Sequence, residues 1–537
     1  MSEPLYYRYW GKTEKEGDRY HLLPYHCLDV AAVISVWWEA STAIRRSFCQ
    51  YAGSNEEQVR AWILLFAALH DYGKFDVRFQ LKSRKTWQIL YPLAGGYNQL
   101  PSERDSREYL HGENGVSWFT QDFFAHVKCD QCNSMYIDDE PAQWLSWKPW
   151  IEDAAGHHGH VKDAAYIVKT AIPSMCDSRL AATDRAARTA WLKDLAYIFL
   201  HPVGLSINDS PPPRSPLFAG LCSVADWLAS RSDETNFSFR QQAEPLSLYY
   251  EKKISADADR IFKLSGIDGT VRSYGGVHRL LPDTAMPRLL QPKVDELPLQ
   301  TGLTIIEAPT GSGKTEAALA YAWRLLAAEM ADSIIFALPT QATANSMLGR
   351  LEKVATKIFK DSPNLLLAHG SARFNNKFAE LRRKSLKDSG EPDGWVQCSE
   401  WLAESRKRIF LGQIGVCTID QVLISVLPVK HRFVRGFGVG RSVLIVDEVH
   451  AYDAYMYGLL EEVLRQQRDV GASAILLSAT LPATQKRQLC AIWQADEQDT
   501  AEPAPYPLIT WVGENEIKPL AITLDEDSFA EFDASLT

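Results

Sequence analysis

The spacing of apolar residues divides the chain into two parts with different secondary-structure signals. In the first part, up to about residue 265, apolar side chains recur every three or four positions, which is the period of an amphipathic helix. The period is clearest over residues 25–40, 56–70, 185–200 and 217–231. We therefore expect an all-α domain over residues 1–265.

After about residue 302, apolar runs become short and rich in β-branched residues, and they alternate with segments of helical period. The runs that predict strands are 303–307, 333–338, 364–368, 408–411, 442–446 and 472–477. Strands that alternate with helices form mainly parallel sheets with helices on both faces. The pattern predicts an α/β domain over residues 302–495, with a junction over residues 266–301 that contains glycines and prolines.

The last segment, residues 496–537, carries many acidic residues, and Lys518 is its one basic residue. Such a lopsided charge is typical of a solvated stretch of chain. We interpret the segment as an acidic tail, or as the start of a linker to a further lobe.

Composition agrees with a multidomain globular protein. A chain of 537 residues is too long for one ordinary core, and 46% hydrophobic with 23% charged residues is a globular balance. Neither a membrane-length apolar run nor a signal peptide is evident, and nine cysteines, an odd number, suggest reduced thiols. We expect a cytoplasmic protein without a membrane partner. The net charge of −10 argues against a chain coated in nucleic acid, although a local basic channel stays possible.

Histidine and aspartate residues near predicted helix ends are the chemically conspicuous feature of the first part. They are His26, His70, Asp71, His111, His157, His158 and Asp226. Imidazole and carboxylate suit first-row divalent ions, and one carboxylate can bridge two of them. A single histidine is more often a helix cap or a satisfied core group. The adjacent pair His70-Asp71 is different, because it ends a strongly apolar helix, where a buried charge without a partner would cost stability.

This pattern resembles the HD superfamily of metal-dependent phosphohydrolases, whose fold is all-helical. The resemblance implies two divalent transition-metal ions, such as Fe, Mn, Co or Ni, that activate a water and neutralise a leaving oxygen. By this resemblance the first ion is held by His26, His70, Asp71 and Asp226. The second ion is held by Asp71, as the bridge, with His111, His157 and His158. Lys74 would face the phosphate, so that Asp71 and Lys74 are the expected catalytic residues.

A phosphate-binding loop opens the second part. The predicted strand 303–307 runs into Ala-Pro-Thr-Gly-Ser-Gly-Lys-Thr, and a helical segment follows. Glycines let backbone N–H groups surround a phosphate, a lysine reaches the β- and γ-phosphates, and the next hydroxyl binds Mg²⁺. The loop therefore predicts a site for ATP with Mg²⁺, formed by Thr310, Gly311, Ser312, Gly313, Lys314 and Thr315.

Further motifs in this part resemble superfamily 2 helicases, which share the Ala308 that replaces the first glycine of the general loop. Asp447 would bind Mg²⁺ through water, Glu448 would polarise the attacking water, and His450 completes the motif. Gln291 is a candidate for adenine recognition. The residues at other predicted strand ends, expected to contact a nucleic-acid backbone, are Thr340, Gln341 and Thr418.

An HD nuclease followed by such a RecA-like P-loop domain resembles the CRISPR-associated helicase-nuclease of type I systems. Residues 412–421 and 446–453 are similar to the subtype E branch, and the resemblance runs over nearly the whole chain. It implies recruitment by the RNA-guided Cascade complex, loading on the displaced single-stranded DNA, and degradation by an ATP-dependent 3′-to-5′ motor.

The family also carries a second RecA-like lobe with an arginine-rich motif and a carboxy-terminal domain, neither of which we find before Thr537. We therefore expect this chain alone to cut single-stranded DNA but not to unwind duplexes processively. A separate second lobe is a possible partner. Whether the chain is a fragment or one piece of a split enzyme stays open.

Two other functions are compatible with these motifs. One is an HD nucleotide phosphohydrolase whose P-loop domain only senses ATP, and the other is a non-catalytic partner that docks on the surveillance complex. The expected backbone contacts at Thr340 and Thr418 favour the nuclease-helicase, because a nucleotide sensor has no need of a track for a strand.

Overall fold

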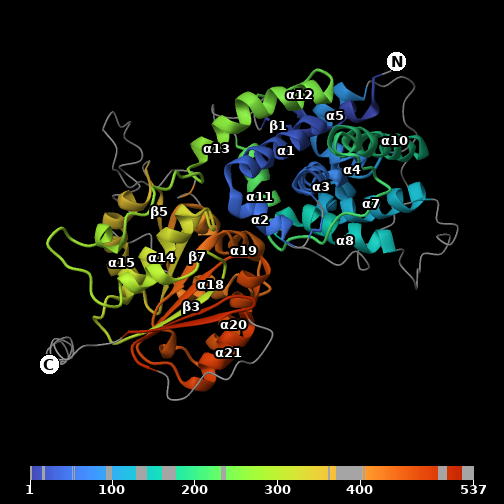
Figure 1. Ribbon diagram of the computed structural model, residues 1–537. Helices are drawn as coiled ribbons and strands as arrows, with labels where there is room; N and C mark the ends of the chain where they lie inside the picture. The colour runs from blue at the N-terminus through green and yellow to red at the C-terminus, as the bar shows by residue number, and fades with distance from the viewer. Residues whose placement is uncertain are drawn as a thin grey trace. The chain divides into compact units, whose positions relative to one another are not determined.

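The chain folds into two compact units (Figure 1). The computed structural model describes residues 3–14, 18–50, 52–53, 55–91, 100–127, 142–159, 177–231, 238–360, 363–369, 402, 406–493 and 505–522. The first unit comprises Met1–Ala40 and Phe48–Leu264, and the second comprises Ser41–Ser47 and Ser265–Thr537. The chain therefore enters the second unit twice, because most of helix α2 (Thr42–Cys49) clusters with it.

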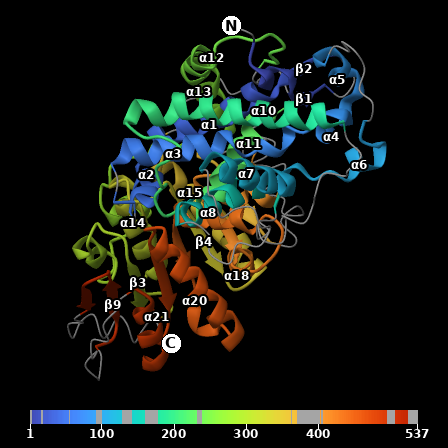
Figure 2. The ribbon, with the colours of Figure 1, turned by 90° about the vertical axis from the view of Figure 1, so that its right-hand side faces the viewer.

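The first unit is helical, as expected. Its longer helices are α1 (Leu23–Ala40), α3 (Glu56–Ala68), α7 (His111–Val127), α8 (Ala142–Ala155), α10 (Ser178–Leu195) and α11 (Phe218–Ala229). The shorter ones are α4 (Val77–Gln80), α5 (Arg84–Leu90), α6 (Glu103–Glu108), α12 (Leu246–Lys252) and α13 (Asp259–Ser265). Helix α1 is apolar almost all round and is buried along most of its length against α3 and α11 (Figure 2).

Aromatic side chains fill the core beneath α3. Trp62 meets Trp147 edge-on, with ring centroids 5.2 Å apart, and Phe66 stacks on Trp150 at 5.0 Å. Rings packed in this way add to the area that they bury. They clamp α3 to α8, and the end of α3 consequently lies inside the unit.

A short antiparallel hairpin, β1 (Trp10–Thr13) with β2 (Tyr20–Leu22), precedes α1. Gly11 lets β1 lie close to this helix, since a Cβ there would approach the Cβ of His26 to 3.0 Å and the Cα of Leu23 to 3.1 Å. The hairpin is a small departure from an all-α unit, and it brings a strand to the helix that carries His26.

The second unit is built on a sheet of eight strands among the described residues, in the order β10-β9-β3-β8-β7-β4-β6-β5. The parallel strands are β3 (Leu303–Glu307), β4 (Ser333–Leu338), β5 (Leu365–Ala368), β6 (Ile414–Thr418), β7 (Ser442–Val446) and β8 (Ala474–Ser478). Its helices are α14 (Lys314–Ala327), α15 (Gln341–Ile358), α18 (Ile419–Leu423), α19 (Arg432–Gly440), α20 (Ala454–Asp469) and α21 (Ala483–Trp493). The mainly parallel sheet confirms the expected α/β class.

One expected strand is wrong. Residues 408–411 lie in a 3₁₀ helix, Arg406–Leu411, and the strand of this region is β6, which begins at Ile414. Four apolar residues are too few for periodicity to distinguish a strand from a buried turn of helix. Packing decides the outcome, because α19 comes so close that a Cβ on Gly438 would lie 2.5 Å from the Cβ of Phe410.

The expected acidic tail is also wrong where the structure describes it. Strand β9 (Leu508–Val512) is fully buried and pairs antiparallel with β3, and β10 (Ile517–Ala521) pairs with β9. The prediction rested on the number of acidic residues and overlooked the apolar run 508–512, which has the β-branched and aromatic content of a strand. Residues 496–504 and 523–537 lie outside the described residues.

In the described part of the chain, no single helix is both long and apolar enough to cross a membrane. Helices α1 and α2 satisfy the length and composition test only as a pair, which bends by 102° at its break.

Candidate metal centre and nucleotide site

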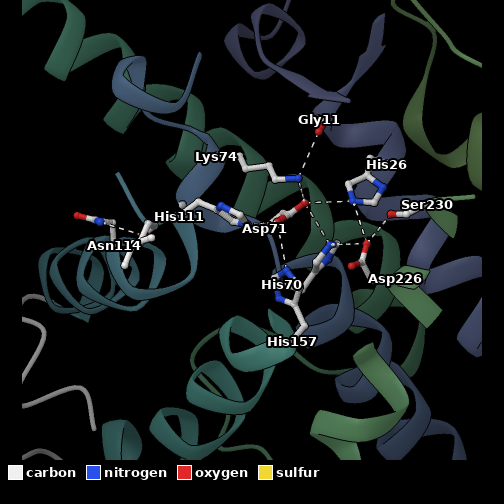
Figure 3. Close-up of polar contacts among 12 residues, drawn as sticks. Gly11, His26, His70, Asp71, Lys74, His111, Asn114, His157, Asp226 and Ser230 are labelled. Atoms are coloured by element: carbon white, nitrogen blue, oxygen red, sulfur yellow. Dashed lines mark hydrogen bonds and ion pairs between the residues drawn. The ribbon is translucent and has the colours of Figure 1, made fainter. Parts of the chain in front are cut away.

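Most of the histidines and aspartates singled out in the sequence meet in one place in the first unit (Figure 3). His70 and Asp71 come just after Leu69, the C-cap of α3, and Lys74 ends the next short turn, Tyr72–Lys74. The other members come from α1 (His26), the start of α7 (His111), the turn Gly156–His158 (His157) and α11 (Asp226). His158 belongs to the same turn as His157, but its side chain lies outside the described part, so its role as a ligand stays a prediction.

The carboxylate of Asp71 is the centre of this group. Its Oδ2 lies 3.1 Å from Nε2 of His26 and 3.2 Å from Nε2 of His70. Its Oδ1 lies 3.3 Å from Nε2 of His111 and 3.6 Å from Nε2 of His157. Each oxygen therefore faces its own pair of imidazoles, an arrangement suited to a carboxylate that bridges two cations.

Asp226 lies beside His26 and His70, the two imidazoles that face Asp71 Oδ2. Its own Oδ1 is 3.4 Å from Nε2 of His26 and 3.9 Å from Nε2 of His70, and it accepts a hydrogen bond of 2.8 Å from Ser230 Oγ. We call His26, His70, Asp71 and Asp226 the first ligand group, and Asp71, His111 and His157 the second ligand group. These are the groupings that the sequence resemblance implies, apart from His158.

The ring orientations fit a metal. Nδ1 of His70 lies 2.8 Å from Ala67 O, and Nδ1 of His157 lies 2.9 Å from Ala154 O. A ring that donates Nδ1–H to a carbonyl turns the lone pair of Nε2 toward Asp71, which is how metal-ligating histidines are held. His70 Nε2 and both oxygens of Asp71 are buried and make no hydrogen bond among the described residues. Buried acceptors that face one another in this way fit a bound cation.

Electrostatics favour the metal-binding forms of Asp71 and His157. Burial opposes ionisation of Asp71, but the charges of Lys74 and His70 outweigh it and hold the pKa of Asp71 well below its usual range. Burial, with the charge of His70, lowers the pKa of His157 to about 4. Although burial opposes it, the charge of Asp71 raises the pKa of His70, so a metal that binds there displaces a proton.

Close backbone packing fixes the distance between Asp71 and His111. A Cβ on Gly73 would lie 1.9 Å from His111 O, and one on Gly115 would lie 2.9 Å from Gly73 N. Gly112 meets Ala155 O in the same way, at 2.7 Å. The first turn of α7 therefore touches the turn after Asp71 through backbone alone. Sequence reasoning missed these glycines, and the Gly-x-x-Gly spacing after His111 is the signal that could have found them.

Lys74 lies at the rim of the centre. Its Nζ is 2.6 Å from Asp71 Oδ2 and donates a hydrogen bond of 3.2 Å to Gly11 O. The structure thus places the lysine on the bridging carboxylate, whereas the sequence resemblance implied a phosphate. Contact with a phosphate stays a prediction for Lys74.

The predicted phosphate loop connects β3 to α14 in the second unit. Gly311 and Gly313 have φ angles of +83° and +90°, in the left-handed region that favours glycine. Nζ of Lys314 donates to Ala308 O at 2.7 Å and to Pro309 O at 3.1 Å. Gln291 lies against the loop, since a Cβ on Gly313 would come within 2.2 Å of its Nε2. The lysine and the glutamine are thus both at the loop, as a nucleotide site requires.

The remaining nucleotide motifs lie on the same edge of the sheet. Asp447 and Glu448 follow β7, and Glu448 has a φ of +51°, a strained value for a residue with a side chain. Nδ1 of His450 lies 3.3 Å from Glu448 Oε2 and 3.1 Å from Ser478 Oγ at the end of β8. Because β3, β7 and β8 are parallel, their carboxyl ends meet at one edge, where such folds bind nucleotides.

The three expected nucleic-acid contacts have different surroundings. Thr340 caps α15, accepting a hydrogen bond of 3.2 Å from Thr343 N, and Gln341 begins that helix with an exposed side chain. Thr418 ends β6 and is buried. Thr340 thus has a local role as a helix cap, and the side chain of Thr418 has little exposure. Binding of nucleic acid by Thr340, Gln341 and Thr418 stays a prediction.

Comparison with known proteins agrees with this two-part architecture. The family model described as "Cas3, HD domain" matches residues 10–235, and the DEAD/DEAH box helicase model matches residues 289–488. The CRISPR-associated endonuclease/helicase Cas3 of Escherichia coli (strain K12) is 50% identical over 96% of this chain and 58% of its own length. The chain thus spans little more than half of that relative.

Solved structures show the same fold. The crystal structure of T. fusca Cas3 covers 97% of this chain with a TM-score of 0.76 and 26% identity, over 57% of that chain. A chain of a CRISPR RNA-guided surveillance complex, pre-nicking, covers 96% of this chain with a TM-score of 0.63 and 24% identity, over 54% of that chain, which is a likeness of fold.

Replacing the bridging carboxylate should remove both ions. We expect Asp71→Asn to reduce Mn²⁺ bound per chain from two to near zero, because both ligand groups lose the carboxylate that they share. His111→Ala should lose one ion only. Equilibrium dialysis with metal analysis measures both, and two ions retained by Asp71→Asn at unchanged affinity would contradict the bridge.

Adding a methyl group between Asp71 and His111 should disrupt the second ligand group. We expect Gly73→Ala to cost about 1–3 kcal/mol of unfolding free energy or more, because the new Cβ collides with the backbone at His111 O, and to lose one of the two ions. Gly458→Ala is the control, since nothing lies within 4 Å of a Cβ there. Equal metal content and denaturation midpoints in the two variants would contradict this account.

Proposed function

Because this chain belongs to the Cas3 family, we propose that its first unit is a two-metal nuclease for single-stranded DNA and its second unit an ATP-binding lobe of a 3′-to-5′ DNA helicase. The observation that carries the proposal is the Asp71 carboxylate, whose two oxygens each face a separate pair of imidazoles. The matched families favour this function over a nucleotide phosphohydrolase with an ATP-sensing domain.

In the first unit, the two ligand groups would hold two divalent ions, which activate a water and neutralise the leaving oxygen of a phosphodiester. Donor sets rich in imidazole suit Mn, Fe, Co or Ni. Burial of His26, His70 and His157 excludes bulk water, and the main-chain bonds at Nδ1 of His70 and His157 fix those two rings. Lys74 supplies a positive charge at the rim, where it would move from Asp71 to a non-bridging phosphate oxygen when the strand binds.

In the second unit, the loop of residues 310–313 would surround the phosphates of ATP through its backbone N–H groups. Lys314 would leave the carbonyls of Ala308 and Pro309 for the β- and γ-phosphates. Thr315 and Asp447 would bind Mg²⁺, and Glu448 would orient the attacking water. Gln291, which lies beside the loop, would recognise the adenine.

We further propose that the protein acts in the cytoplasm on DNA that a Cascade complex has opened. Support comes from the CRISPR-associated relatives and from the shared fold of a surveillance-complex chain. ATP-driven movement would need a second lobe, in the same or another polypeptide, to close on the one RecA-like sheet of the described residues. The 537 residues by themselves are therefore expected to cut single strands without processive unwinding.

Nuclease chemistry should be independent of the nucleotide site. We expect circular single-stranded DNA to be cut with Mn²⁺, Co²⁺ or Ni²⁺, and not in the presence of a chelator, because all proposed ligands lie in the first unit. Lys314→Ala should cut at the same rate with or without ATP, whereas Asp71→Asn should be inactive. Gel separation of circular from linear and shortened DNA measures this, and cleavage that survives chelation or requires Lys314 would overturn the proposal.

A further inference from the structure

Lys12 is a half-buried lysine of the first unit that sequence reasoning did not single out. It lies on β1, directly after Gly11, whose carbonyl accepts the hydrogen bond from Lys74. Its Nζ donates a hydrogen bond to Ala229 O, the carbonyl of the last residue of α11. The side chain therefore reaches from the strand beside His26 to the end of the helix that carries Asp226.

The bond has a clear function at that helix end. The last carbonyls of a helix have no partner within the helix and carry partial negative charge, so a cation there stabilises the terminal turn. Asp226 lies in this turn, three residues before Ala229. The next residue, Ser230, donates its hydroxyl to Asp226 Oδ1 at 2.8 Å. Two donors thus hold the turn, one through its backbone and one through the carboxylate itself.

The charge of Lys12 also acts on the first ligand group. Burial lowers the pKa of Lys12 to about 8, and the charges of Asp226 and Asp29 oppose this shift. Lys12 therefore interacts electrostatically with Asp226 of this group.

We propose that Lys12 is a positioning residue for the first ligand group: by holding Ala229 O it fixes the last turn of α11, so that Asp226 Oδ1 faces Nε2 of His26 and His70. The proposal deepens the function above and rests on its metal centre. Residues outside the ligand shell commonly change metal affinity by about 10–100-fold when they are replaced.

The test measures Mn²⁺ affinity of each ligand group separately. In a His111→Ala background the first group binds alone, and in a His26→Ala background the second group binds alone. We expect Lys12→Met to weaken Mn²⁺ binding about 10-fold or more in the first background and to leave it unchanged in the second. Lys12→Arg, which keeps a donor and a charge, should restore most of the affinity.

Lys357→Met is the matched control, because Lys357 also donates to a carbonyl, Leu281 O at 3.1 Å, but in the second unit. It should not change Mn²⁺ affinity in either background. Thermal unfolding of each variant without metal identifies any general loss of fold, and Lys12→Arg keeps the test decisive if Lys12→Met unfolds.

Three results would overturn the proposal. Equal weakening in both backgrounds would mean that Lys12 supports the unit in general. Unchanged Mn²⁺ affinity in the first background, with a raised KM for single-stranded DNA, would mean that Lys12 binds a phosphate. If neither background binds Mn²⁺ while Lys12 is intact, the two-group centre itself is wrong, and the role of Lys12 fails with it.

Discussion

Removing a carboxylate from water costs several kcal/mol unless other groups compensate its charge, and the side chain of Asp71 is only 1% exposed. Its surroundings supply that compensation from several elements: Lys74 at one oxygen, and imidazoles from α1, the turn after α3, α7 and the turn of His157 around both. Much of the first unit follows from the need to bring these elements to one buried point. The aromatic core places the end of α3 inside, and glycines let β1 and α7 approach it by their backbones.

The proposed site of the second unit differs from the buried centre of the first, because a nucleotide must be able to enter and leave it. Parallel strands bring loops of distant sequence to one edge, which Lys314 reaches after β3 and Asp447 and His450 reach after β7. Glu448, just after β7, has a strained positive φ. The contact between His450 and Ser478 links the ends of β7 and β8. The edge is therefore a candidate for coupling nucleotide chemistry to movement of the sheet's loops.

Sequence reasoning predicted what depends on residue type and spacing. Helical periods over α1, α3 and α11 were visible, and so were β3, β4 and β7, whose bounds match their apolar runs. It failed where packing decides, as in the helical turn at Arg406–Leu411 and in β9, an apolar strand inside an acidic segment. The ligand histidines could be named from a family pattern. Gly73 and Lys12 could not, because their roles depend on backbone contacts between segments far apart in sequence.

The central claim is that one carboxylate serves two cations. Crystals of the protein soaked in Mn²⁺, with anomalous diffraction data at the manganese edge, test it most directly. A carboxylate shared by two cations predicts two anomalous peaks about 3.5–4 Å apart, one beside each oxygen of Asp71, with the first near His26 and the second near His111. A single peak, or two peaks of which only one contacts Asp71, would contradict it.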